Sequence, residues 1–389
     1  MSKWKMVKLG DVGLIVTGNT PPTKNIEYYE NADIAFYKPN DLKEYTVSKL
    51  DKAYMAVDNR AKEKLRILPT NSVLVTCIGT IGKVGVSTNV ECATNQQINA
   101  IIPKCELCDG MYLAYAIFSK QKYMQDIANA PVVPIINKSD FSKIEIPLPP
   151  LEEQKKIAAE LDKINELIAK RKKQIEKLDL LVKSQFVEMF GDPVTNPMGW
   201  KSGTIRNIVS EVKYGTSKPA VKGGKYFYLR MNNITYDGRL DLSNLKNIDI
   251  ADNEFEKCAV RKGDVLFNRT NSKELVGKTC VYDLNEAMVI AGYIIRIRVN
   301  NKAVPIYLSA VLNSRYGKGT LFDMCKAIVG QANINAQELQ DIKILIPPIH
   351  LQNQFADFVT KVEQTKDKMQ IALSKLETLY KARMQEYFS

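Results

Sequence analysis

Two stretches of the chain carry apolar residues at the spacings of three, four and seven that a coiled-coil seam requires. The first runs from Leu151 to about Phe190 without glycine or proline, and Gly191 follows it. The second runs from Ile349 to Ser389. We predict one long helix in each stretch. The predicted seam residues are Leu161, Ile164, Ile168, Ile175, Leu178 and Val182 in the first helix, and Val359, Val362, Met369, Leu373, Leu376 and Tyr380 in the second.

The segments that precede the two helices have a different pattern. Short β-branched runs such as "NSVLVTCIG" and "INAIIP" alternate with turn residues and an apolar helix candidate, "GMYLAYAIFSK". This pattern predicts an α+β fold with two globular domains of mixed α and β structure. The predicted layout is a first domain over residues 1–150, a helical region over 151–192, a second domain over 193–348 and a second helical region over 349–389.

The chain contains this domain-and-helix unit twice. The segment "IEIPLPPLEEQKKIAAELDKI" aligns with "IKILIPPIHLQNQFADFVTKV", and the alignment continues without a gap until Phe190 meets Phe388. The domains repeat more faintly: "FYKPNDL" corresponds to "FYLRMNNI", which places Asn40 opposite Asn232. Because the helices are similar while the domains differ, the pattern suggests a constant scaffold that holds two variable recognition domains.

Two helices of matched length and seam are expected to pair, because each would otherwise expose its apolar stripe to water. Burying one Leu or Ile side chain contributes about 1.5–3 kcal/mol. We therefore expect an antiparallel coiled coil within the chain, related by a pseudo-twofold axis, with the domains at opposite ends. The alternative is that each helix covers its own domain or pairs with another chain.

The charge balance favours a polyanionic partner without establishing one. Among 389 residues the formal net charge is +12, and Lys and Arg gain by neutralising phosphates. The hydrophobic and charged fractions, 45% and 25%, are ordinary for globular proteins. The basic run from Lys170 to Lys173 lies among acidic residues of the first helix and is better explained as a solvated helix face.

We expect a cytoplasmic protein with reduced thiols. The opening "MSKWKMVKLG" lacks the apolar core of a signal peptide, and no stretch approaches the ~18 apolar residues of a membrane-spanning helix. Seven scattered cysteines do not form a disulfide framework. Cys105 and Cys108 form one CxxC pair, but the only histidine, His350, is far away in the sequence, so no metal site is expected.

Catalytic motifs are missing from the sequence. "GTIGK" and "LVGKT" lack the first glycine of a Walker loop, and no G-x-G-x-x-G follows a strand. "GDPVTNP" is not the Asn/Asp-Pro-Pro-aromatic motif of amino-methyltransferases, and one histidine leaves little prospect of a His-based triad. We expect no catalytic residues and no cofactor in this chain.

The doubled "IPLPPLEEQKKIA" and "ILIPPIHLQNQFA" segments, the "FVEMFGD" helix end, and the "TNQQINAIIP" and "VGQANINAQEL" stretches resemble the specificity subunit of type I restriction-modification systems. The resemblance covers nearly the whole chain. It implies two target recognition domains, each reading half of a split target in double-stranded DNA, with the helices setting their spacing. Two methyltransferase subunits would supply S-adenosylmethionine chemistry, and restriction subunits would add cleavage that requires ATP and Mg²⁺. The second helix has His350, Leu351 and Asn353 where the first has Glu152, Glu153 and Lys155, so the docking faces are not expected to be identical.

The same resemblance suggests where DNA is contacted. Asn and Gln can pair with adenine edges and Arg or Lys with guanine, while other basic residues hold phosphates. The candidates in the first domain are Lys38, Asn40, Lys83, Asn95, Gln96 and Gln97, and those in the second are Lys213, Lys218, Arg230, Asn232, Arg269, Asn271 and Lys278. Each candidate has a structural alternative, because Asn and Gln also cap turns and exposed Lys promotes solubility.

Three other functions stay open at this point. A tandem-domain DNA-binding regulator would act without enzymatic partners, although no helix-turn-helix signature is evident. A fragment of a fused restriction-modification enzyme would differ in its partner architecture. A coiled-coil adaptor would leave two large domains unexplained.

Overall fold

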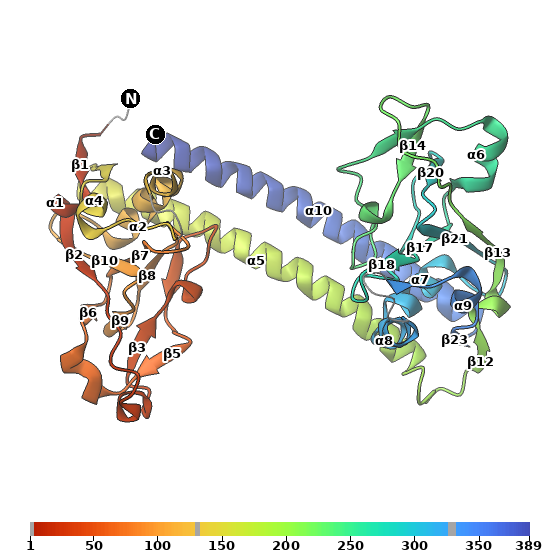
Figure 1. Ribbon diagram of the computed structural model, residues 1–389, viewed down its shortest axis with the longest axis horizontal. Helices are drawn as coiled ribbons and strands as arrows, with labels where there is room; N and C mark the ends of the chain where they lie inside the picture. Colours follow the sequence, from red (N-terminus) through yellow and green to blue (C-terminus); the bar gives the residue numbers. More distant parts are fainter. Residues whose placement is uncertain (1–3, 129–132, 326–331) are drawn as a thin grey trace. The chain divides into compact units, whose positions relative to one another are not determined.

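Both stretches with a coiled-coil seam form uninterrupted helices, α5 (Leu151–Phe190) and α10 (Ile349–Phe388), as the pattern predicts (Figure 1). Gly191 ends α5 with a φ of 74°, in the left-handed region that favours glycine. The computed structural model describes residues 4–128, 133–325 and 332–389, so the start of "VGQANINAQEL", residues 329–331, lies outside the described part. The chain divides into a first unit, Met1–Lys173 with Gln370–Ser389, and a second unit, Gln174–Met369.

The first unit is built on two sheets and a strand pair. The larger sheet has the order β2 (Gly13–Thr17), β10 (Ile98–Pro103), β7 (Val73–Thr76), β8 (Val84–Ser87) and β4 (Ser48–Leu50). The smaller sheet has the order β5 (Met55–Val57), β3 (Ile34–Tyr37), β9 (Glu91–Thr94) and β6 (Leu68–Pro69), while β1 (Met6–Lys8) pairs with β11 (Glu145–Pro147). The helices are α1 (Leu9–Val12), α2 (Gly110–Ser119), α3 (Gln121–Ile127) and α4 (Lys138–Ser142), with 3-10 turns η1 (Ile26–Tyr29), η2 (Pro39–Asp41) and η3 (Asn59–Lys64).

The second unit repeats this plan. One sheet has the order β13 (Val209–Tyr214), β21 (Ile294–Val299), β17 (Val265–Asn268) and β19 (Thr279–Val281). The other has the order β15 (Lys246–Ile248), β14 (Tyr226–Leu229), β20 (Met288–Ile290) and β16 (Ala259–Val260); β12 (Lys201–Thr204) pairs with β23 (Lys343–Ile346), and β18 (Thr270–Asn271) with β22 (Ala332–Asn333). The helices are α6 (Asp252–Cys258), α7 (Pro305–Asn313), α8 (Arg315–Met324) and α9 (Ala336–Gln340), with 3-10 turns η4 (Ile205–Ile208) and η5 (Met231–Asn233).

The start of each long helix is fixed to its own domain by one buried glutamine. The Gln154 amide accepts a hydrogen bond from the Asp109 backbone N–H at 2.9 Å and donates to the carbonyls of Leu107 and Pro149 at 3.0 and 2.8 Å. Gln352 in α10 has the same three kinds of partner. It accepts from Val304 and donates to Lys302 and Pro347 at distances of 2.8–3.1 Å. The persistence of this glutamine in both halves of the sequence therefore has a structural reason.

The end of each long helix packs into a domain core through an aromatic residue. At the end of α5, the Phe190 ring lies 4.9 Å from that of Tyr307 in the second unit. At the end of α10, the Phe388 ring lies 5.5 Å from that of Tyr112 in the first unit. Both tyrosine hydroxyls donate 2.8 Å hydrogen bonds to backbone carbonyls in the strand that precedes a long helix.

The two long helices run antiparallel in each unit. In the first unit, Glu160 accepts a hydrogen bond from the Tyr387 hydroxyl and the later residue Lys172 forms an ion pair with the earlier residue Glu377. In the second unit, Asp179 contacts Lys366, and the Phe190 ring lies 5.5 Å from that of Phe355. The predicted intramolecular pairing is confirmed, and both long helices contribute to both cores.

All twelve predicted seam residues are buried or half-buried, but the seam contains one residue that the prediction missed. Lys366 lies between Val362 and Met369 at the position that Ile168 occupies in α5, and its side chain is only 2% exposed. It contacts Asp179 and, at 3.2 Å, Glu363. Arg239, from the turn that follows η5, reaches both carboxylates at 3.2–3.3 Å. A charged cluster thus interrupts the apolar seam.

The described residues give no sign of a membrane segment or a metal site. None of their helices combines the length and apolar character needed to cross a bilayer. They also contain no group of three or more His, Cys, Asp or Glu residues placed to hold a metal ion. All seven cysteines are free, and Cys105 is the exposed one.

Candidate nucleic-acid interface

In the first unit, the predicted DNA-contacting residues meet where two parallel strands end. Strands β3 and β9 pair in parallel, with Tyr37 opposite Thr94, so the chain leaves both at the same edge of the sheet. There η2 follows β3, and its Asp41 carboxylate accepts a 2.7 Å hydrogen bond from the Lys38 backbone N–H. This local bond fixes the turn and leaves the Asn40 side chain exposed.

The amide residues after β9 lie beside that turn. The Asn95 backbone N–H donates to the Tyr37 carbonyl at 3.2 Å, while its side-chain amide donates to the Gln97 amide oxygen at 2.8 Å. Gln96 is exposed and accepts a hydrogen bond from the Thr20 hydroxyl. Asn95 is buried, so its amide orders the turn, whereas Gln96 is the amide that faces solvent.

The second unit builds the same edge from β14 and β20, which also pair in parallel. The Asn233 side chain accepts a 2.9 Å hydrogen bond from the Arg230 backbone N–H, as Asp41 does from Lys38. Arg230 and Asn232 therefore occupy the places of Lys38 and Asn40, and Asn232 is likewise exposed. The faint sequence repeat between the domains corresponds to a repeated turn.

A lysine reaches back to this turn in both units. Lys83 Nζ lies 3.5 Å from the Pro39 carbonyl, and Lys278 Nζ lies 2.9 Å from the Met231 carbonyl. Lys278 is 8% exposed, and burial lowers the pKa of its ammonium. These lysines support the turn as well as adding positive charge to it.

The other second-domain candidates lie at separate places. The Arg269 guanidinium stacks on the Tyr214 ring at 4.9 Å, and its backbone N–H donates to the Tyr293 carbonyl that follows β20. Asn271 lies in β18. Lys213 and Lys218 already have carboxylate partners in the free protein, Glu211 at 2.6 Å and Glu254 at 2.5 Å.

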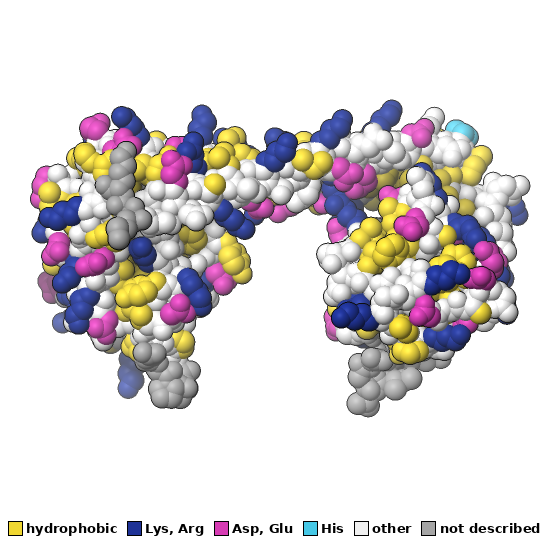
Figure 2. Space-filling view, turned by 90° about the horizontal axis from the view of Figure 1, so that it is seen from above, with side chains coloured by type: hydrophobic (Ala, Val, Ile, Leu, Met, Phe, Trp, Pro, Cys, Tyr) yellow, Lys and Arg dark blue, Asp and Glu magenta, His cyan; other side chains and the backbone are white. Residues whose placement is uncertain are grey.

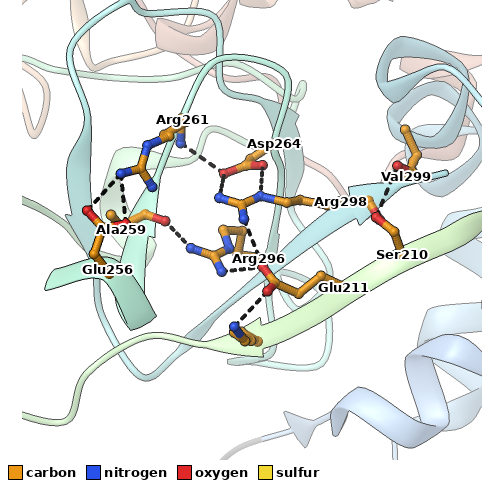
Figure 3. A network of polar contacts seen from close by, with 10 residues as sticks. Ser210, Glu211, Glu256, Ala259, Arg261, Asp264, Arg296, Arg298 and Val299 are labelled. Atoms are coloured by element: carbon orange, nitrogen blue, oxygen red, sulfur yellow. Dashed lines mark hydrogen bonds and ion pairs between the residues drawn. The ribbon is translucent and has the colours of Figure 1, made fainter. Parts of the chain in front are cut away.

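Ion pairing separates the arginines of the second unit into two groups. Arg261, Arg296 and Arg298 form an interlocked network with Glu211, Glu256 and Asp264 (Figure 3). Among the described residues, Arg230 and Arg269 have no carboxylate partner, and the Nε atom of each is buried without a hydrogen bond. Arginines held by carboxylates stabilise the domain, whereas Arg230 and Arg269, which have no such partner, keep their charge available to an anion.

Two aromatic residues at this edge were missed by the sequence interpretation. Aligning Ile98 with Ile294 places Tyr293, which is exposed, opposite Gln97, and this signal was present in the sequence. Tyr236, on the turn after η5, is also exposed and carries the Lys318 ammonium 4.9 Å from its ring centre.

The positive charge is not gathered into one large patch on the face that Figure 2 shows. Lys and Arg side chains are spread over both units there, with Asp and Glu among them. On this face the distribution of charge therefore does not by itself locate a site for a polyanion.

Two α+β units that share antiparallel helices, each presenting an amide and a cation on the same turn, make this a tandem-repeat protein. The family model described as "Type I restriction modification DNA specificity domain" matches residues 1–178 and 197–378. The chain belongs to this family.

Individual relatives agree with that assignment. The chain is 28% identical over 293 residues to the type I restriction enzyme MjaIX specificity subunit of Methanocaldococcus jannaschii, covering 69% of this chain and 66% of that one. It is 24% identical over 386 residues to the EcoKI specificity subunit of Escherichia coli, covering 93% of this chain and 82% of the other. The fold is that of the type I restriction-modification S subunit from M. genitalium, with a TM-score of 0.64 at 15% identity over 100% of this chain and 96% of that one.

Proposed function

We propose that this chain is the subunit that selects the DNA target of a type I restriction-modification complex, with each domain reading one half of a split sequence. The observation that carries the proposal is the repeated turn at the ends of parallel strands. It presents Lys38 and Asn40 in one unit and Arg230 and Asn232 in the other. Membership of the specificity family supports the same conclusion.

The chemistry of these side chains suits base reading. An Asn amide can donate to and accept from an adenine edge, and an Arg guanidinium can donate twice to guanine. Lysines around the turns would hold phosphates and fix the register of each domain on the duplex. Two half-sites read by one chain would combine modest affinities into a selective interaction.

The long helices would hold the two readers at a set separation and provide docking surfaces for partner subunits. Each helix contributes to the cores of both units, which supports such a linking role. In this proposal two methyltransferase subunits bring S-adenosylmethionine, and restriction subunits bring ATP and Mg²⁺. The complex would work in the cytoplasm, and this chain would contribute recognition without catalysis.

The decisive experiment is single-molecule sequencing of DNA modification in cells that express the cognate methyltransferase with and without this chain. We expect a split adenine-methylated motif only when the chain is present. Replacing residues 1–150 with the corresponding domain of a relative should then change one half of the motif. Methylation that is the same without the chain would contradict the proposal.

Arg230→Ala and Arg269→Ala are each expected to cost about 1–3 kcal/mol of binding and to relax specificity in one half-site only. The reason is that these guanidinium groups have no carboxylate partner among the residues that the structure describes. Methylation rates on targets altered in either half measure the effect. Arg261→Ala is the matched control, because Arg261 is already held by Glu256 at 2.9 Å and should leave specificity unchanged. Equal weakening on every sequence would instead make Arg230 or Arg269 a phosphate contact.

A tandem-domain regulator without enzymatic partners is the alternative. It predicts that the chain binds a split site by itself and does not co-purify with a methyltransferase. Co-purification together with a new methylated motif would exclude it.

A further inference from the structure

Two neighbouring lysines of the second unit, Lys278 and Lys318, lie buried and half-buried, and neither has a carboxylate partner among the described residues. Lys278 precedes β19 and donates to the Met231 carbonyl, as described above. Lys318, near the start of α8, donates to the Gly277 carbonyl at 3.0 Å. Burial, followed by the positive charge of Lys278, lowers the pKa of Lys318 to about 8. In the part of the chain that the structure describes, neither ammonium has a carboxylate within ion-pair distance, and each is bonded to a backbone carbonyl instead.

Both ammonium groups keep hydrogen-bonding capacity after their internal contacts are counted. Each carries three N–H donors, and a single backbone carbonyl is bonded to each. The Lys318 ammonium also lies 4.9 Å from the centre of the Tyr236 ring. Placing two like charges side by side in a partly dehydrated site is unfavourable unless an anion completes it.

The first unit has the same architecture without the second charge. There the carbonyl of Gly82, which corresponds to Gly277, accepts a 3.1 Å hydrogen bond from the Gln121 amide. Gly82 and Gly277 both adopt positive φ, 83° and 75°. A neutral amide therefore satisfies this structural position, so packing and hydrogen bonding do not require the Lys318 charge.

We propose that Lys278 and Lys318 form a preformed anion site that receives one backbone phosphate of the DNA half-site read by the second domain. The proposal rests on the DNA-reading function proposed above and names one of its phosphate contacts. It also makes the two domains unequal, because DNA binding by the second domain would weaken more steeply with salt than DNA binding by the first.

The first test needs no DNA and is therefore independent of the function. NMR titration of the lysine Nζ groups in the full chain, assigned with Lys318→Arg, should show a depressed pKa for Lys318. Adding inorganic phosphate at constant ionic strength should raise this pKa, because a bound anion favours the charged ammonium. The charged or titratable groups that face Lys318 are Lys278 and Tyr236. A pKa that does not move with phosphate would overturn the proposal even if the chain reads DNA.

The second test measures the contact on DNA. The chain, in complex with its methyltransferase, is titrated with a duplex at several salt concentrations. Lys318→Gln, which installs the residue type found in the first domain, should reduce the slope of log affinity against log salt by about 1. The melting temperature at pH 7 should stay the same or rise, because the substitution removes a half-buried charge that has no carboxylate partner among the described residues.

Lys225→Gln is the matched control for net charge. Lys225 lies in the same unit but is paired with Asp252 at 2.6 Å, so removing it should leave the salt slope unchanged. An unchanged slope for Lys318→Gln, with wild-type complex that binds DNA, would overturn the phosphate site alone. A wild-type complex that binds no DNA, together with a phosphate-dependent pKa of Lys318, would overturn the proposed function while leaving an anion site.

Discussion

Gln352→Glu is expected to destabilise the second unit by about 3 kcal/mol or more, because unsatisfied buried groups cost about 1–3 kcal/mol each. The substitution keeps the shape of the side chain but replaces an amide N–H₂ with a carboxylate oxygen. That oxygen would face the carbonyls of Lys302 and Pro347 at about the distances of the lost bonds, 3.1 and 2.8 Å. Gln352 is fully buried, so water cannot compensate for the repulsion.

The effect should be confined to the unit that contains the substitution. Hydrogen exchange measured by mass spectrometry should show lost protection within Gln174–Met369 for Gln352→Glu and within Met1–Lys173 for Gln154→Glu. Gln354→Glu is the matched control in the same first turns of α10. Gln354 is exposed, and a carboxylate near a helix N-terminus is favourable by about 0.3–1 kcal/mol. Gln352→Glu should therefore lower the free energy of unfolding, whereas Gln354→Glu should raise it slightly. A small effect of Gln352→Glu would mean that the glutamine contacts are not needed to hold the helix.

The second large effect is expected where Lys366 lies in the helix seam. Asp179→Asn combined with Glu363→Gln should destabilise the chain by about 3–5 kcal/mol, the cost of leaving a buried charge unpaired. The Lys366 side chain is only 2% exposed, whereas the side chains of Asp179 and Glu363 are 41% and 40% exposed. Burial raises the pKa of both carboxyls, and the charge of Arg239 opposes that shift.

Removing the lysine itself should be much less costly. Lys366→Ile installs the residue that α5 has at the equivalent position, and the half-exposed carboxylates keep Arg239 as a partner. We expect a change in unfolding free energy within about 1 kcal/mol, because apolar replacement of a buried ion pair is often neutral or stabilising. Denaturant unfolding of the double variant and of Lys366→Ile makes the comparison. Equal losses of unfolding free energy in the double variant and in Lys366→Ile would contradict the prediction that unpairing the lysine costs more than removing it.

Much of the architecture was predictable because the sequence repeats itself. The helix bounds follow from the seam and from Gly191, and the antiparallel pairing follows from two matched apolar stripes. Lys366 was not predictable, because periodicity identifies apolar positions and a buried lysine leaves only a gap between Val362 and Met369. Its partners, Asp179 and Arg239, are brought to it by tertiary structure.

The candidate interface was predictable at the turns and less so beyond them. The correspondence of Asn40 with Asn232 located the same exposed position in both domains. The sequence could not distinguish a cation that is paired with a carboxylate from one that is not, because pairing depends on which residues the fold brings close together. Lys213 and Lys218 are paired with acidic residues, while Lys318 is not, and all three are simply lysines in the sequence.

The glutamine contacts at the two helix starts involve only backbone groups of the domain that they hold. Gln154 touches the main chain of Leu107, Asp109 and Pro149, and none of those contacts depends on the identity of a side chain. Substitutions in the recognition turns can therefore accumulate without disturbing this attachment. Substitutions should be tolerated well in the recognition turns and poorly at Gln154 and Gln352. New target preferences can therefore arise while the helical scaffold is retained.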